Sequence, residues 1–74
     1  MPDDALYCFT IYDHPRDAPD FFVVRRFAIR EDQLLPLEAL CAKTLEEARA
    51  ALPPGLVLVP RSPDDDPTII ETWI

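Results

Sequence analysis

The sequence has few of the residues on which catalytic and metal-binding motifs depend. Its 74 residues include one glycine, Gly55, and one histidine, His14. A single glycine excludes the dinucleotide-binding fingerprint and the Walker phosphate loop, since both need several glycines. A single histidine excludes the two-histidine zinc motifs. The one serine, Ser62, has no flanking glycines of the kind found in a nucleophile elbow. The sequence therefore favours a protein without catalytic activity and without a cofactor.

The cysteines and apolar runs are equally sparse. Cys8 and Cys41 are far apart and form no CxxC pair, which argues against zinc-ribbon or thioredoxin chemistry. No apolar run approaches the roughly 20 residues of a membrane span. Asp3 and Asp4 make the N-terminus unlike a signal peptide. We expect reduced thiols in a cytoplasmic protein, while a disulfide between the two cysteines stays open as an alternative.

The charge is acidic, with 14 Asp and Glu against 7 Lys and Arg, for a net charge of −7. An acidic surface repels phosphate groups, so neither nucleic acid nor a membrane is expected as a partner. Arg25 and Arg26 are too small a basic footprint to reverse this, and we expect them to form ion pairs. The 49% of hydrophobic residues is nevertheless typical of a folded chain, and residues 1–74 are long enough for one domain.

The first part of the chain reads as two strands, residues 5–12 and 21–29, joined antiparallel by the loop 13–20. The more apolar face of the second strand is predicted to face the core, and Arg25 on that face would need a carboxylate partner or a route to the sheet edge. That face carries Phe21, Val23, Arg25, Phe27 and Ile29.

The middle of the chain is harder to interpret. Residues 30–36 are predicted to be a loop, and residues 37–43 fit either a strand or a helix, with the strand favoured. Thr44 to Glu47 match a capping box, in which Thr44 caps the amide of Glu47 and the Glu47 carboxylate returns to the Thr44 amide. A short helix is therefore predicted over about 44–52, and it must pack on the sheet to be stable.

The last part predicts a buried strand over 56–59, an acidic loop over 60–68 and a final strand over 69–74. The fold class is α+β: a single small domain with a mainly antiparallel sheet of four or five strands and the helix packed on it. If 37–43 is a strand, the helix connects it to the 56–59 strand in a right-handed parallel crossover.

Alternating strand directions place the loop 13–20, the helix start and the loop 60–68 at one end of the sheet. The candidate ligand-binding residues at this end are His14, Arg16, Lys43 and Arg61, and Asp17 and Asp64 to Asp66 lie among them. Such cations could bind a small anion. The simpler interpretation is a set of turn residues and ion pairs between the arginines and the aspartates. The aspartate run lacks the spacing and the glycine of a calcium loop, so no metal is expected.

Apolar side chains on both faces of the strands exceed what one short helix can cover. We therefore expect a protein partner or a homodimer through the open sheet face. The candidate interface residues are Tyr12, Phe21, Phe22 and Trp73, although Trp73 fits the core beneath the helix equally well.

Three stretches resemble a group of short bacterial hypothetical proteins with no assigned activity. They are IYDHPRDAPDFFVVRRFAI at 11–29, TLEEARAALPPGL at 44–56 and PRSPDDDPTIIETWI at 60–74. The resemblance implies a cytoplasmic bacterial protein and assigns no role to any residue.

Two functions follow from these observations. The favoured one is a small acidic interaction module that acts through its sheet face. The alternative is a small-ligand or anion-binding protein, or a minor enzyme, that uses the loop end around His14, Arg16 and Arg61. Arginines that are paired with the aspartate run would favour the first function, and an open pocket with unpaired arginines would favour the second.

Overall fold

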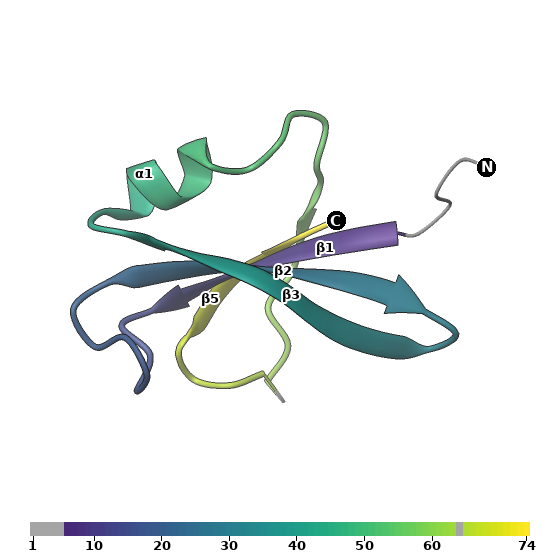
Figure 1. Ribbon diagram of the computed structural model, residues 1–74, viewed down its shortest axis with the longest axis horizontal. Helices are drawn as coiled ribbons and strands as arrows, with labels where there is room; N and C mark the ends of the chain where they lie inside the picture. Colours follow the sequence, from purple (N-terminus) through teal and green to yellow (C-terminus); the bar gives the residue numbers. More distant parts are fainter. Residues whose placement is uncertain (1–5, 64) are drawn as a thin grey trace.

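The computed structural model describes residues 6–63 and 65–74, so the predictions for Asp3, Asp4, Ala5 and Asp64 lie outside the described residues. These described residues form a five-stranded antiparallel sheet with one short helix, which confirms the predicted α+β class (Figure 1). The strand order is β3-β2-β1-β5-β4. The elements are β1 Leu6–Asp13, β2 Phe22–Arg30, β3 Gln33–Ala42, α1 Leu45–Ala50, β4 Leu58–Val59 and β5 Ile69–Trp73.

β2 and β3 form a long hairpin with a two-residue turn. Glu31 and Asp32 have φ angles of 47° and 67°, and two successive positive φ angles are typical of a type I′ turn. The favoured strand over 37–43 is confirmed, whereas the predicted loop over 30–36 is wrong because β3 already begins at Gln33. Pro36 obscured this strand, and it is tolerated because β3 lies at the sheet edge.

The helix α1 begins at the predicted cap. Thr44 is extended, and its Oγ1 accepts a hydrogen bond from the Glu47 amide at 3.1 Å. The Glu47 carboxylate accepts from the Lys43 amide at 3.1 Å, one residue before the amide that the capping box predicts. The helix covers only Leu45–Ala50, so it is shorter than the predicted 44–52. It ends ahead of Pro53, because proline disfavours the helical conformation of the residue that precedes it.

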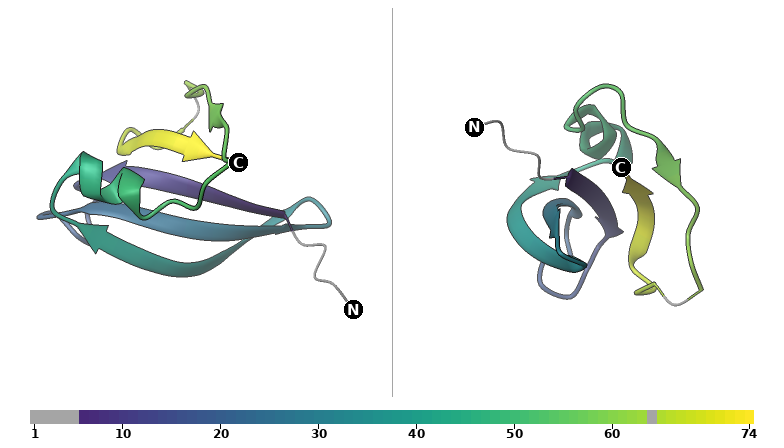
Figure 2. Two further views of the ribbon diagram at one scale, coloured as in Figure 1. Left: turned by 90° about the horizontal axis from the view of Figure 1, so that it is seen from above. Right: turned by 90° about the vertical axis from the view of Figure 1, so that its right-hand side faces the viewer.

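The core lies between α1 and one face of the sheet, which we call the covered face. Ile11, Val24, Ala42 and Ala48 form a buried cluster there. The partly buried side chains that pack against this cluster are Phe9, Phe22, Leu45, Leu52, Ile70 and Trp73. Figure 2 shows α1 on a single side of the curved sheet.

The predicted orientation of β2 is therefore wrong, since Phe22 and Val24 face the helix and the Val23 side of the strand faces away. The less apolar side of β2 can face the helix because its charge is accommodated. The Arg26 guanidinium lies 4.8 Å from the centre of the Tyr7 ring, and its Nε lies 2.9 Å from Glu38 Oε1. A guanidinium that lies over an aromatic ring and beside a carboxylate has favourable partners, so Arg26 does not need to be buried.

β4 departs most from its predicted role. β3 and β4 run in the same direction, as the predicted crossover requires, but they lie at opposite edges of the sheet. β4 pairs only with β5, and the side chains of Leu58 and Val59 are 49% and 37% exposed. The predicted strand buried on both faces is therefore wrong. A continuous apolar run shows that a segment is hydrophobic, but it does not show whether the segment lies at the centre or at the edge of the sheet.

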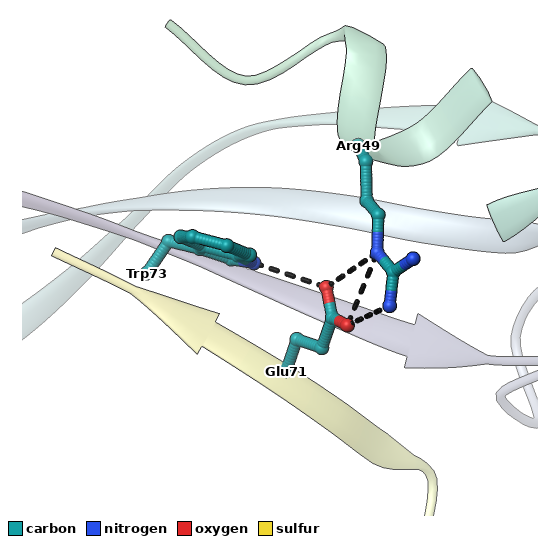
Figure 3. Close-up of polar contacts among 3 residues, drawn as sticks. All are labelled: Arg49, Glu71 and Trp73. Carbon is teal, nitrogen blue, oxygen red and sulfur yellow. Dashed lines mark hydrogen bonds and ion pairs between the residues drawn. The ribbon is translucent and has the colours of Figure 1, made fainter. Parts of the chain in front are cut away.

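A carboxylate on β5 links the sheet to the helix (Figure 3). Both oxygens of Glu71 accept from Arg49 Nε at 3.1 Å, and one also accepts from Arg49 Nη2. Trp73 Nε1 donates to Glu71 Oε1 at 3.1 Å. The Glu71 side chain is 11% exposed, and these donors, Arg49 first, hold its pKa below the ordinary value. This network fastens α1 across the covered face.

Candidate functional site

The face of β1, β2 and β3 that points away from α1 is called the open face below. The strand register arranges its side chains in four rows that run across the three strands. In order from the hairpin end to the loop end, the rows are Leu6–Ile29–Leu34, Cys8–Phe27–Pro36, Thr10–Arg25–Ala39 and Tyr12–Val23–Cys41. The first two rows contain no charged residue, whereas the last two meet the loops. The open face therefore has two chemically different ends.

The first two rows form an apolar patch at the hairpin end. Leu6 is 63% exposed and Leu34 is 59% exposed, while Phe27 and Ile29 between them are half-buried. Among the described residues, no helix covers this face. Large apolar patches on a monomer often mark a site of association. The patch consists of Leu6, Cys8, Phe27, Ile29, Leu34 and Pro36.

The other end of the open face is a hollow of about 580 Å³ between two loops. Figure 1 shows both loops, which follow β1 and β4, on the side of the sheet away from α1. A hydrogen bond of 2.7 Å from the Asp13 amide to the Thr68 carbonyl joins them. The hollow is lined by Tyr12, Pro15, Arg16, Asp17, Val23, Arg25, Asp66, Pro67 and Thr68.

The charged side chains of the hollow balance one another. Arg25 Nη2 lies 3.9 Å from Asp17 Oδ2, which supplies the carboxylate partner that Arg25 was predicted to need. Asp66 Oδ1 accepts from the Thr68 amide at 2.9 Å and from Thr68 Oγ1 at 2.8 Å. These hydrogen bonds, and to a smaller extent the charge of Arg16, hold the pKa of Asp66 below its ordinary value. Two guanidinium groups and two carboxylates thus line one cavity.

Tyr12 forms part of the wall between these charges. Burial raises the pKa of its phenol, against the smaller opposing effect of Arg25. The phenol therefore stays protonated at neutral pH and can donate a hydrogen bond into the hollow.

Only one of the four predicted ligand residues, Arg16, lines the hollow. His14 Nδ1 contacts the neighbouring Asp13 carboxylate, and its ring lies edge-on to Phe22. Arg61 Nε donates to the Ile69 carbonyl at 2.9 Å, which fixes the start of β5. Lys43 is exposed beside the helix cap. The loops do meet at one end, but most of these side chains have structural partners there.

The sequence placed Asp17 and Asp66 at this end of the sheet among the candidate ligand residues, as partners for the arginines, but it did not assign Arg25 or Tyr12 to a ligand site. Arg25 was noted as the single charge on an apolar strand face, and that misfit was the signal that could have identified it. Tyr12 lies in the next row of the same face. The residues on β1 and β2 supply the floor of the hollow, and the loops supply its rim.

The predicted interface residues divide between the two faces. Phe22 and Trp73 pack against the core on the covered face, which agrees with the alternative role considered for Trp73. Tyr12 lines the hollow, and Phe21 is half-buried where the loop enters β2. The most exposed large apolar side chains of the patch on the open face are instead those of Leu6 and Leu34.

Both cysteines are free thiols, Cys8 buried and Cys41 exposed, and burial raises the pKa of Cys8. Within residues 6–63 and 65–74, no three His, Cys, Asp or Glu side chains gather in a way that could hold a metal ion. The helix of this described part is too short and too polar to cross a membrane.

Comparison with known proteins identifies no relative of this chain. No protein-family model matches it, and comparison with the curated proteins and with the solved structures finds no match. The resemblance to short bacterial proteins therefore stays a prediction.

Proposed function

We propose that the protein is a non-catalytic interaction module that binds a second copy of itself through the apolar patch. The observation that carries this proposal is the pair of adjacent rows across three strands that contain no charge, with Leu6 and Leu34 more than half exposed, on a face that no helix of the described residues covers. Removing such side chains from water is favourable at roughly 25 cal/mol per Å² of buried apolar area.

A second copy suits this surface because the patch is uncharged. The chain carries a net charge of −7, which repels an identical molecule over most orientations. Contact through the patch adds no like charge at its centre. A two-fold arrangement places the same apolar rows on both sides of the contact, as symmetric dimers require. The two sheets would then pack face to face with a shared apolar layer.

The sheet edges are less suitable for association than the face. β3 is long, but three features interrupt its middle. They are Pro36, the charged Glu38, and a register shift in its pairing with β2 between Arg25 and Phe27. Prolines, irregularities and charges are the means by which edge strands avoid pairing with other chains. β4, at the other edge, has only two residues. Binding by strand addition is therefore disfavoured relative to packing through the open face.

The proposal includes a location in the bacterial cytoplasm. Two free thiols, one of them exposed, support it because they persist in a reducing compartment.

Sedimentation equilibrium of the full chain tests the proposal with two neighbouring leucines. Leu34 belongs to the patch, whereas Leu35 is 42% exposed on the other face of the same strand. We expect dimerisation at high micromolar concentration. Leu34→Asp should weaken it by about a hundredfold, since it buries a charge at the contact. Leu35→Asp, the matched control, should leave it nearly unchanged.

Three results would contradict the proposal. A wild-type chain that stays monomeric at high micromolar concentration would remove it. Equal weakening by both substitutions would point to edge pairing of β3 instead of face packing. Weakening by Leu35→Asp alone would place the contact on the covered face. Circular dichroism of both variants keeps loss of folding apart from loss of association.

A further inference from the structure

The hollow at the loop end has properties that self-association does not use. It combines cations, anions and a phenol with apolar walls in one cavity of about 580 Å³, a size common among small-molecule sites. We infer that it binds a free α-amino acid as a zwitterion, with the ligand carboxylate at Arg25 and the ligand ammonium at Asp17.

The balance of charges selects a ligand that carries both signs. A purely anionic ligand at Arg16 and Arg25 would lie beside the carboxylates of Asp17 and Asp66, which line the same cavity. A purely cationic ligand would meet the two guanidinium groups. A zwitterion offers a partner of opposite charge to both kinds of group, so it avoids an uncompensated charge in the cavity.

The spacing of Arg25 and Asp17 selects an α-amino acid among zwitterions. Their closest atoms are 3.9 Å apart, which is beyond hydrogen-bonding distance. The two groups attract each other across a gap, and each retains capacity to bond a ligand placed beside it. An α-amino acid carries its ammonium and carboxylate on one carbon, which suits two charges at this separation. The ends of an extended tripeptide are about 10 Å apart and could not bridge them.

The other residues of the hollow provide contacts for the remaining parts of the ligand. The protonated Tyr12 phenol can donate to the ligand carboxylate beside Arg25. Pro15, Val23 and Pro67 supply apolar wall against which an aliphatic side chain can pack. Asp66 is held by Thr68, so it fixes the rim of the hollow while Asp17, whose side chain is 73% exposed, contacts the ligand.

An amide NMR titration of the full chain tests this inference with four matched probes. L-Leucine carries both charges, 4-methylpentanoate lacks the ammonium and 3-methylbutylamine lacks the carboxylate. The tripeptide Gly-Leu-Gly separates the two charges. We expect the tightest saturable shifts at the hollow residues with L-leucine, and no saturation with Gly-Leu-Gly. Each single-charge probe should bind about tenfold more weakly or not saturate, since each loses one charge-assisted contact.

Three variants assign the contacts. Arg25→Gln and Asp17→Asn should each weaken L-leucine binding by about tenfold or more. Lys43→Gln removes one positive charge, as Arg25→Gln does, from an exposed position outside the hollow. It should leave binding unchanged. Asp17 lies in an exposed loop, so Asp17→Asn remains informative if the Arg25 variant fails to fold.

The inference is overturned if L-leucine produces no saturable shifts at the hollow, or if 4-methylpentanoate binds as tightly as L-leucine. Tighter binding of Gly-Leu-Gly would assign the hollow to peptide ends instead of free amino acids. If Lys43→Gln weakens L-leucine binding as much as Arg25→Gln does, the weakening is due to the change in net charge and not to a contact in the hollow. None of these results depends on whether the apolar patch forms a dimer.

Discussion

The two faces of the sheet alternate along the same strands, but α1 packs on only one of them. On the covered face, Ile11 and Val24 are enclosed by α1 and by aromatic side chains. On the open face, Leu6 and Leu34 remain more than half exposed. The same alternation of side chains produces both faces, so the difference comes from where the six residues of α1 pack.

Charge is also handled differently on the two faces. The covered face encloses Glu71, which is 11% exposed and receives hydrogen bonds from Arg49 and Trp73. On the open face, Arg25 and Asp17 are 3.9 Å apart, and the Asp17 side chain is 73% exposed. Buried and fully bonded charges serve to fasten elements together, whereas exposed and loosely paired charges are available to a ligand. The comparison therefore separates a face whose carboxylate links two elements from a face whose charges the proposed ligand would use.

The largest difference is expected from two adjacent valines, each 5% exposed, that point to opposite faces. Val24→Ala should destabilise the monomer by about 2–3 kcal/mol, because it loses two methyl groups and leaves a cavity beneath α1. Val23→Ala should cost about 1.5 kcal/mol, because it loses the same two buried methyl groups but leaves no closed cavity at the wall of the open hollow. Urea unfolding at low micromolar concentration measures both.

Equal losses of stability in the two valine variants would break the comparison, since the open face would then be packed as tightly as the covered one. A larger loss for Val23→Ala would reverse it.

The next effect concerns the two carboxylates. Glu71→Gln should destabilise the protein by about 1–1.5 kcal/mol, since it removes the charge from a carboxylate that is 11% exposed, while the side chain of its partner Arg49 is 49% exposed. Asp17→Asn should cost about 0.5 kcal/mol or less, as exposed pairs do. Because the folded pKa of Glu71 lies below its unfolded value, its contribution is complete above the ordinary glutamate pKa. That contribution is lost as the pH falls through the lower folded value.

Urea unfolding as a function of pH measures this dependence. The wild type and Asp17→Asn should lose stability together as the pH falls below the ordinary glutamate pKa, whereas Glu71→Gln should show a flatter profile. An unchanged profile in Glu71→Gln would show that the network does not fasten α1.

The smallest effect is expected at the hairpin turn, which belongs to neither face. Glu31 and Asp32 both have positive φ, which is unfavourable for residues with a Cβ atom other than asparagine and aspartate. Replacing the pair by Asn-Gly should stabilise the protein by about 0.5–1 kcal/mol, measured as a higher thermal midpoint. Dimerisation and ligand binding should not change. Destabilisation would show that the turn side chains contribute contacts to the patch.

Local patterns predicted much of the fold. The strands that include Tyr7, Val24 and Ile70 were recognised from alternation and β-favouring residues, and Thr44 identified the helix start. The first half of β3 was missed because Pro36 is unusual in a strand, and only an edge position explains it. The exposure of β4 was missed because an apolar run looks the same at an edge as at the centre of a sheet.

The candidate site could be predicted only in part. Counting strand directions brought the two loops together, and Arg16 was correctly placed among the residues of that end. The roles of His14 and Arg61 could not be foreseen, because their partners are a neighbouring side chain and a backbone carbonyl. Arg25 was identified as a misfit, but its partner Asp17 depends on how the intervening loop folds.

By itself, the sequence determined the α+β class, the antiparallel pairing of β1 with β2 and the position of the helix cap. These features follow from side-chain alternation and from hydrogen bonds within a few residues, so short segments carry the information. Tertiary structure alone decided which face α1 covers, which apolar strand lies at an edge and which charges share the hollow. Those outcomes depend on the packing of segments far apart in the chain, because burial and electrostatic pairing are properties of the assembled sheet.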